Sequence, residues 1–332
     1  MNIAHPTPAR ITHVLNFSGG KDSTAMYLLA LEMREQMSRR GHELMVVFAD
    51  TGHEHPLTYD YIRALPGLTG GPEIRWVKAD FTADITRKRD FIAGHWAEDG
   101  VPQAHIDRVL ELLHPTGIPF LDLCMMKGRF PSTRRRFCSE ELKHKPVLEQ
   151  VQAPLLDDGC DVWSWQGVRA DESPSRARLP RMDVAVTHSS GAEMVNVRPI
   201  LRRDVEWVFD MHRRHGIAPN PLYKQGMGRV GCMPCIHCRK DEMRQIDDRF
   251  PQELDRVAEW EFLVSATSKR GCSTFFSYDT IPGDHTKDKS LPMPRIAEVA
   301  QWSHTGRGGR QFDWLLGETT DGKCSSLYGL CE

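Results

Sequence analysis

The sequence has no run of about 18 uninterrupted apolar residues, the length that an apolar helix needs to cross a bilayer. Its first ten residues show no basic segment followed by an apolar core, so they do not resemble a secretory signal. Internal repeats and low-complexity tracts are also absent. We therefore expect a cytoplasmic globular protein that is neither exported nor inserted in a membrane.

An excess of charge is lacking as well, because 43 Lys and Arg face 45 Asp and Glu, for a formal net charge of −2. The whole chain has no global attraction to nucleic acid, so any such binding must rest on a local patch. The densest basic stretch consists of Arg129, Arg134, Arg135, Arg136, Lys143 and Lys145. It fits phosphate or polyanion binding, and it fits an ordinary solvated face equally well.

The length of 332 residues exceeds one ordinary domain of roughly 100 to 200 residues. We expect a large α/β domain over residues 1–215 and a smaller C-terminal lobe over 216–332, which carries a cysteine cluster. A polar, helical stretch at about 84–132, broken by glycines and prolines, is predicted to be an insertion over the active face.

Apolar runs alternate with helical patterns along the first domain. Strands are predicted at 11–17, 43–49, 73–79, 162–168 and 194–199, and helices at 23–38, 59–65, 204–215 and 251–268. Strands separated by helices favour a parallel sheet that is covered by helices on both faces.

A phosphate-binding loop is predicted between the first strand and the first helix. It reads Ser18, Gly19, Gly20, Lys21, Asp22 and Ser23. The small residues allow the backbone to approach phosphates, and the helix N-terminus directs N–H groups at them. Lys21 adds positive charge, and Asp22 is placed to help hold Mg²⁺ beside a pyrophosphate. The alternative is a Gly-Gly turn that only joins a strand to a helix.

This loop resembles the PP-loop superfamily of ATP pyrophosphatases, whose fold is of the adenine nucleotide alpha hydrolase type. Further segments resemble the phosphoadenosine phosphosulfate (PAPS) reductase family: FADTGHEHP at 48–56, RRFCSEELKHKP at 135–146, GVRADESPSR at 167–176 and GCMPC at 231–235. Relatives of this kind include phage- and plasmid-borne proteins, DNA phosphorothioation enzymes and a CRISPR-associated type.

The resemblance implies an adenine nucleotide, ATP or the sulfonucleotides PAPS and APS, across the carboxyl ends of the strands. Asp50, Thr51 and Gly52 would lie near its base or ribose. Arg169 and Arg176 would clamp an anionic group and act in catalysis with Lys21 and Asp22. The alternative is a solvated loop with ordinary ion pairs.

Nine cysteines, an odd number in a reducing compartment, favour metal binding or redox chemistry over disulfides. Cys232, Cys235 and Cys238 form a double C-x-x-C, and Cys138 is the natural fourth ligand. The resemblance implies a [4Fe–4S] cluster, although the family has two adjacent cysteines where this chain has Phe137-Cys138. Zinc, with His237 as a further ligand, and no metal at all remain alternatives.

Three functions are compatible with these motifs. The first is cleavage of ATP between its α and β phosphates to adenylylate an acceptor, either a sulfur carrier or a nucleic acid; the intact loop favours it. The second is a sulfonucleotide reductase that uses Cys331 or Cys324 and a thioredoxin-type reductant. The third is a catalytically silent nucleotide-binding subunit of a defence or CRISPR complex. Assembly into a homo-oligomer is left open.

Overall fold

The computed structural model describes residues 10–277, 279–282 and 293–306, and within them the chain forms a six-stranded sheet of order β3-β2-β1-β4-β6-β5. The strands are β1 (Ile11–Phe17), β2 (Glu43–Asp50), β3 (Ile74–Lys78), β4 (Asp161–Trp165), β5 (Met182–Thr187) and β6 (Glu193–Val197). All neighbouring strands are parallel except β5, which runs antiparallel to β6 at the edge. The predicted parallel sheet is confirmed, and β5 is an addition to it.

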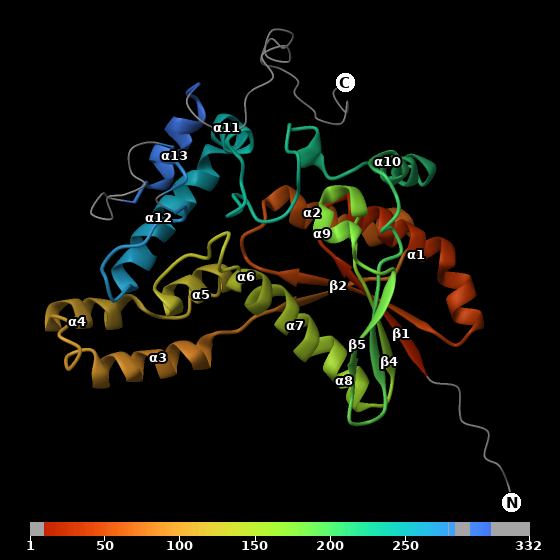
Figure 1. Cartoon of the computed structure of the whole chain (residues 1–332), viewed down its shortest axis with the longest axis horizontal. Coiled ribbons are helices and arrows are strands. Elements are labelled where there is room, and N and C mark those ends of the chain that lie inside the picture. Colours follow the sequence, from red (N-terminus) through yellow and green to blue (C-terminus); the bar gives the residue numbers. More distant parts are fainter. Residues whose placement is uncertain (1–9, 278, 283–292, 307–332) are drawn as a thin grey trace, which may run out of the picture.

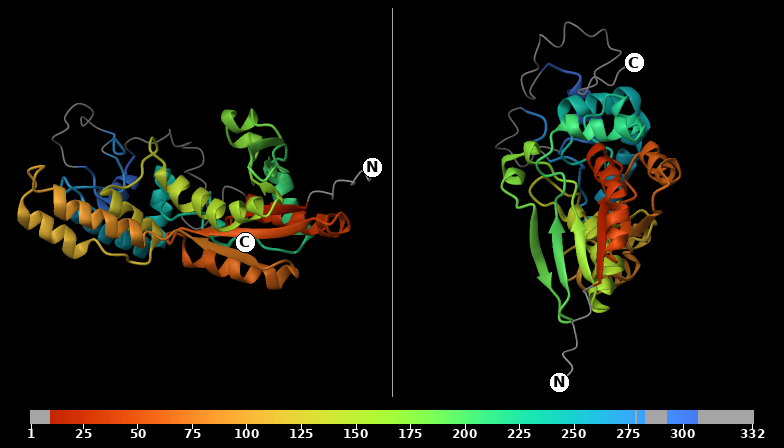
Figure 2. Two further views of the ribbon diagram at one scale, coloured as in Figure 1. Left: turned by 90° about the horizontal axis from the view of Figure 1, so that it is seen from below. Right: turned by 90° about the vertical axis from the view of Figure 1, so that its right-hand side faces the viewer.

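Helices cover both faces of this sheet, as predicted (Figure 2). On one face, Leu15 and Phe17 share a buried cluster with side chains of α1 (Lys21–Arg39), α2 (Pro56–Thr69) and α10 (Val205–Arg214). On the other face, Val14 and Val162 meet Val147, Val151 and Leu156. These last three belong to a helical run made of α6 (Phe137–Ser139), η1 (Glu140–His144), α7 (Lys145–Val147), η2 (Leu148–Gln152) and α8 (Ala153–Asp157).

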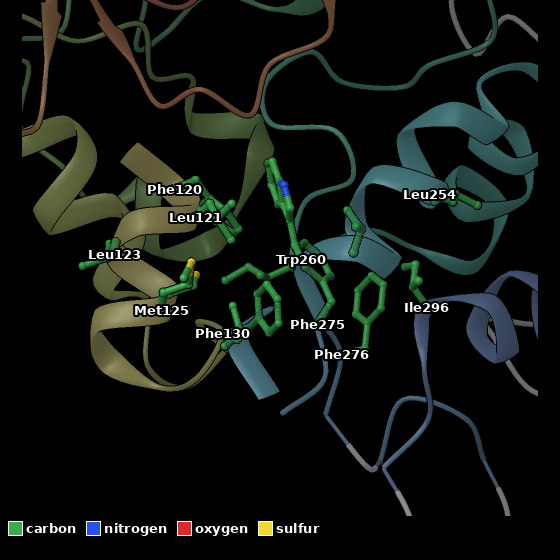
Figure 3. Close-up of a cluster of buried hydrophobic side chains, with 14 of the residues drawn as sticks. Phe120, Leu121, Leu123, Met125, Phe130, Leu254, Trp260, Phe275, Phe276 and Ile296 are labelled. Atoms are coloured by element: carbon green, nitrogen blue, oxygen red, sulfur yellow. The ribbon is translucent and has the colours of Figure 1, made fainter. Parts of the chain in front are cut away.

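A second core lies beyond the end of the sheet to which β1 and β2 point (Figure 1). It is built from α3 (Thr82–His95), α4 (Gln103–Leu112), α5 (Pro119–Lys127), α11 (Lys240–Arg249), α12 (Pro251–Thr267) and α13 (Ile296–Ser303). Phe120 and Phe130 pack there with Trp260 and Phe275 from the C-terminal part (Figure 3). The helical insertion therefore shares one core with the C-terminal segment.

Three short helices complete the described part: η3 (Ala170–Glu172), α9 (Pro174–Ala177) and η4 (Pro221–Tyr223). In the chain, η3 and α9 come after β4, and η4 comes after α10. None of the described helices combines the length and the apolar character needed to span a membrane.

The buried His13 on β1 makes the stability of the sheet depend on pH. Its Nδ1 accepts a hydrogen bond from the Trp165 indole at 3.0 Å, and its Nε2 lies 3.0 Å from Nδ1 of His42. Burial, helped by His42, lowers the pKa of His13 to about 4. Between these two pH values His13 therefore stays neutral in the folded protein, whereas in the unfolded chain it binds a proton near the ordinary histidine pKa, about 6.5.

We predict that stability falls as the pH is lowered from about 6.5 towards 4, and that His13→Asn weakens this dependence. Asparagine keeps an acceptor for the indole but does not titrate. Urea unfolding of both proteins at about pH 7.5 and pH 5 measures the effect. Equal losses of unfolding free energy in the two proteins would show that His13 is not responsible.

Candidate functional site

The predicted phosphate loop, the Asp50–Gly52 segment and the segment that contains Arg169 all follow parallel strands at one edge of the sheet. The loop follows β1, which lies between β2 and β4. Chain connections leave β1 in opposite directions on its two sides, and such a switch point opens a crevice at the carboxyl ends of the strands. The fold therefore gathers these segments at the edge of the sheet where such folds form a crevice.

The loop has a backbone that only glycine suits at its second position. Gly19 has φ +73°, and a Cβ there would lie 3.0 Å from Thr58 Cγ2 and 3.1 Å from Ile62 Cγ1. The Ser18 hydroxyl donates to Ser23 Oγ at 3.1 Å, and Ser23 Oγ donates to the Gly20 carbonyl at 3.0 Å. These contacts fix the turn into α1, whose first N–H groups have no partner within the helix and favour an anion.

Two buried cations flank one carboxylate at this helix start. Lys21 Nζ lies 3.0 Å from Asp22 Oδ2, and Arg169 Nε donates to Asp22 Oδ1 at 2.5 Å. Arg169 also donates to Asp171. Lys21 is 7% exposed and Arg169 5%. The carboxylate holds both cations in place at the loop, where they can bind phosphate oxygens.

Three residues that were not expected from the sequence brace the loop: His212 in α10, and Asn220 and Tyr223 in the chain that follows α10. The Lys21 backbone N–H donates to the Tyr223 hydroxyl at 3.0 Å, and Asn220 Nδ2 donates to the Gly19 carbonyl at 3.2 Å. The His212 ring nitrogen Nε2 lies 3.1 Å from the Lys21 carbonyl, and burial lowers the pKa of His212. About two hundred residues separate these groups from the loop, so no local spacing signals them.

Asp50 and Thr51 are tied to neighbouring side chains. Asp50 Oδ1 accepts from the Gly52 N–H and from the Tyr59 hydroxyl, each at 2.8 Å. The Thr51 hydroxyl lies 2.9 Å from the carboxylate of Glu54, which is only 2% exposed. Burial, Glu54 and Asp50 together raise the pKa of Tyr59. Glu54, which was not predicted from the sequence, thus interacts with both Thr51 and Tyr59.

Arg169 and Arg176 lie at different places. Arg169 reaches the loop through Asp22, whereas the half-exposed Arg176 pairs with Glu172. Glu172 also accepts from the Arg169 N–H at 3.0 Å. Glu172 therefore links the two arginines, and only Arg169 is in contact with the loop residues that the sequence predicted.

The cysteine segment runs directly beside the Asp50–Glu54 segment. Cys232 forms an isolated antiparallel bridge with Glu54, and the Met233 N–H donates to the His53 carbonyl at 2.9 Å. Cys232 Sγ lies 3.7 Å from Thr51 Oγ1 and 3.8 Å from Glu54 Oε1. One thiol of the predicted cluster thus adjoins a segment predicted to bind the nucleotide.

The four predicted ligand thiols gather near one another. Burial, and after it Cys235, raises the pKa of Cys138. Burial raises the pKa of Cys232 to about 12, with contributions from Glu54 and Cys235 that Lys143 opposes. Burial, Glu242 and Cys235 raise that of Cys238. Cys235 therefore lies within electrostatic reach of the other three thiols.

Lys143 faces the same group. Cys232 is the main cause of its raised pKa, and Glu54, Cys235 and Cys138 add to it. Three of the four thiols thus act on this lysine, and such a set suits a negatively charged thiolate-bound centre, which is the donor chemistry of iron–sulfur and zinc sites. As they stand, no three His, Cys, Asp or Glu side chains in the described ranges are arranged to hold a metal ion.

The other cysteines differ in exposure. Cys124 and Cys160 are fully buried, whereas Cys272 is exposed. The pKa of Cys124 is raised by its burial. Cys324 and Cys331, the thiols named for a reductase mechanism, lie outside the described residues.

The geometry at Gly19 gives a prediction with a matched control. Gly41 has φ +72° but open space around its Cβ position, so Gly41→Ala introduces only backbone strain, about 1–2 kcal/mol. Gly19→Ala adds the contacts with Thr58 and Ile62, at a further cost of about 1–3 kcal/mol. Urea unfolding measures both. Equal destabilisation by the two variants would contradict the close packing of the loop on α2.

Comparison with known proteins agrees with these features. Residues 12–84 and 129–238 match the family model of the phosphoadenosine phosphosulfate reductase domain. The chain is 47% identical over 333 residues to the uncharacterized 37.8 kDa protein in the gpa 5′ region of Escherichia phage 186, with 96% of each covered. It is 29% identical over 169 residues, 50% of each chain, to the uncharacterized nin region protein ORF290 of Escherichia phage lambda.

An enzyme of sulfur metabolism is among the relatives. Adenosine 5′-phosphosulfate reductase of Allochromatium vinosum is 33% identical over 88 residues, which cover 26% of this chain and 32% of that one. The crystal structure of phosphoadenylyl-sulfate reductase from Candida auris aligns at 18% identity with a TM-score of 0.37, covering 68% of this chain and 82% of that one. On the strength of the family match and the full-length phage relative, the chain belongs to the phosphoadenosine phosphosulfate reductase domain family.

Proposed function

We propose that the protein is a PP-loop enzyme that binds ATP and cleaves it between the α and β phosphates to adenylylate an acceptor. The observation that carries this proposal is the buried assembly of Lys21, Asp22 and Arg169 at the N-terminus of α1. Such a set suits a chain of phosphates better than a single anion, because it combines helix N–H groups with two fixed cations.

In this mechanism an acceptor oxygen attacks the α-phosphorus, and the bond to pyrophosphate breaks as the new bond forms. Lys21 and Arg169 offset the negative charge that develops on the phosphoryl oxygens, and Arg176, linked to Arg169 through Glu172, would add a further positive charge. Asp22 would hold Mg²⁺, which neutralises charge on the phosphates when bound. The protein also positions ATP and the acceptor relative to each other.

Asp50, Thr51 and Gly52 would face the adenosine part of the nucleotide. The position of these residues at the end of β2, next to the loop, supports this role. The acceptor is a sulfur carrier or a nucleic acid, and either one would receive the adenylyl group at the same crevice.

The second candidate is a sulfonucleotide reductase, and the relatives named adenosine 5′-phosphosulfate reductase favour it. A thiolate would attack the sulfonate sulfur, AMP would leave, and a thioredoxin-type reductant would release sulfite. Incubation with α-labelled ATP and with adenylyl sulfate separates the two functions. Sulfite release that Cys331→Ala abolishes would establish the reductase and overturn our first choice.

Asp22 provides the direct test of the phosphate site. We predict that Asp22→Asn lowers pyrophosphate release about 10²–10³-fold, as expected for the loss of one preorganised charged group. Asp60→Asn, a change of the same kind on the exposed face of α2, should leave the rate unchanged. Pyrophosphate is measured with a coupled phosphate assay. Equal rates for Asp22→Asn and the wild-type protein would exclude the proposed role.

We further propose that Cys138, Cys232, Cys235 and Cys238 hold a [4Fe–4S] cluster, with zinc as the alternative. Its support is the electrostatic influence of Cys235 on the other three thiols, and that of Cys138, Cys232 and Cys235 on Lys143. The cluster would supply an electron-rich thiolate-bound centre next to the nucleotide site, and the protein's own part is to place Lys143 and Glu54 against it.

Anaerobic purification tests this ligand set. Cys235→Ala should lose most of the bound iron and acid-labile sulfide, because Cys235 is the thiol that lies within electrostatic reach of the other three. The control Cys272→Ala removes an exposed thiol outside the proposed ligand set, and this variant should retain both iron and sulfide. Iron, sulfide and zinc are measured together on each protein. A colourless wild-type protein that contains zinc would replace the cluster by a zinc site.

A further inference from the structure

A groove opens beside the second core, and neither the loop residues nor the four proposed ligand thiols line it, although Cys272 does. It has a volume of about 570 Å³ and lies between α3, the chain just after α5, and the segment after α12. Its walls come from parts of the sequence that lie more than a hundred residues apart, so it exists only in the folded protein. The sequence pointed to it only through Arg129, the first residue of the basic stretch.

Positive charge is concentrated in this groove although the whole chain has a formal net charge of −2. Among the described residues that line it, the cations are Lys88, Lys127, Arg129, Lys269 and Arg270, and the one carboxylate is Asp99. Lys269 lies 2.8 Å from Asp99, and Lys127 lies 3.7 Å from Glu141. The groove therefore favours an anionic ligand.

Three of these cations carry charge that no described carboxylate offsets at ion-pair distance: Lys88, Arg129 and Arg270. Burial, and then Lys269, lowers the pKa of Lys88. A bound anion would favour the charged form of this lysine. The groove thus has a net positive charge that the protein itself leaves uncompensated within the described ranges.

Aromatic rings accompany the cations. Phe91 is 46% exposed at the groove, with His95 stacked on it at 4.6 Å and Lys88 Nζ 5.2 Å from its ring centroid. Trp96 and Phe130 form deeper parts of the wall. An exposed ring does not stabilise a small inorganic anion. A nucleobase, in contrast, stacks on such a ring while its phosphate binds the cations.

The groove is continuous with the basic stretch that the sequence singled out. Arg129 lines the groove, and the exposed Arg134, Arg135 and Arg136 follow it in the chain. Phe137 and Cys138, one of the proposed ligand thiols, come directly after Arg136. The basic stretch therefore links the groove to Cys138 along the chain.

We propose that this groove binds single-stranded nucleic acid, with bases against Phe91 and phosphates against Lys88, Arg129 and Arg270. The alternation of cations with an exposed ring is the physical basis of strand binding without strict sequence reading. Strand binding does not depend on the proposed adenylylation. If both hold, the groove favours a nucleic acid over a sulfur carrier as the acceptor.

The test uses the purified full-length protein with its bound metal and fluorescently labelled 20-nucleotide single strands of DNA and RNA. Anisotropy is measured at several salt concentrations. The triple variant Lys88→Glu, Arg129→Glu, Arg270→Glu should bind at least tenfold more weakly. Its plot of log affinity against log salt should be shallower by about two units, because about three phosphate contacts are lost at roughly 0.7 each.

A control with the same change of charge is Arg39→Glu, Arg40→Glu, Arg213→Glu, at exposed positions of α1, its C-terminus and α10. It should bind the strands nearly as the wild-type protein does. Phe91→Ala should lower affinity about fivefold or more with an unchanged salt slope, since stacking carries no charge. Circular dichroism checks folding, and the single change Arg270→Gln serves if the triple variant is unfolded.

Equal losses in the groove and control variants, or no binding by the wild-type protein, would overturn the proposal. ATP binding measured on the same variants separates this result from the proposed function. Loss of strand binding with retained ATP binding supports the groove. Retained strand binding in a protein that binds no ATP would leave the groove standing and refute the adenylylation.

Discussion

The Asp22 carboxylate, held between the buried Lys21 and Arg169, is the interaction on which the candidate site depends. Two cations at the N-terminus of α1 repel each other and lose water on burial, so without a counter-charge they would not stay there. Asp22 provides that charge and joins the loop after β1 to the segment after β4. A nucleotide bound there, as we propose, would bring further negative charge to the same place, where its phosphates would share the cations that Asp22 has already positioned.

The segment from His212 to Met233 connects this charge cluster to the thiols. His212, Asn220 and Tyr223 contact the backbone of the loop, and Cys232 and Met233 contact the segment after β2. One continuous stretch of chain thus contacts both the loop and the segment after β2 before it enters the second core. These contacts join the loop and Cys232 through a single stretch of chain.

Much of this framework could be predicted from local sequence, and the failures have physical causes. The bounds of β1 at 11–17 were predicted correctly because its apolar residues are buried on both faces. Strand β5 was missed because it is an exposed edge strand, and the helical run 137–157 because Pro146, Pro154 and π-helical turns disturb its period. The loop and the cysteines are contiguous motifs, whereas Glu54, Lys143 and Tyr223 gain their neighbours only through tertiary packing.

The account rests on phosphate binding by the loop, and isothermal titration calorimetry of the metal-replete wild-type protein with ATP and Mg²⁺ tests it most directly. We expect saturable binding at one site per chain, which weakens when ATP is replaced by AMP because fewer phosphates reach Lys21 and Arg169. An absence of heat with ATP and with every other adenosine phosphate, adenylyl sulfate included, would contradict the account at its base.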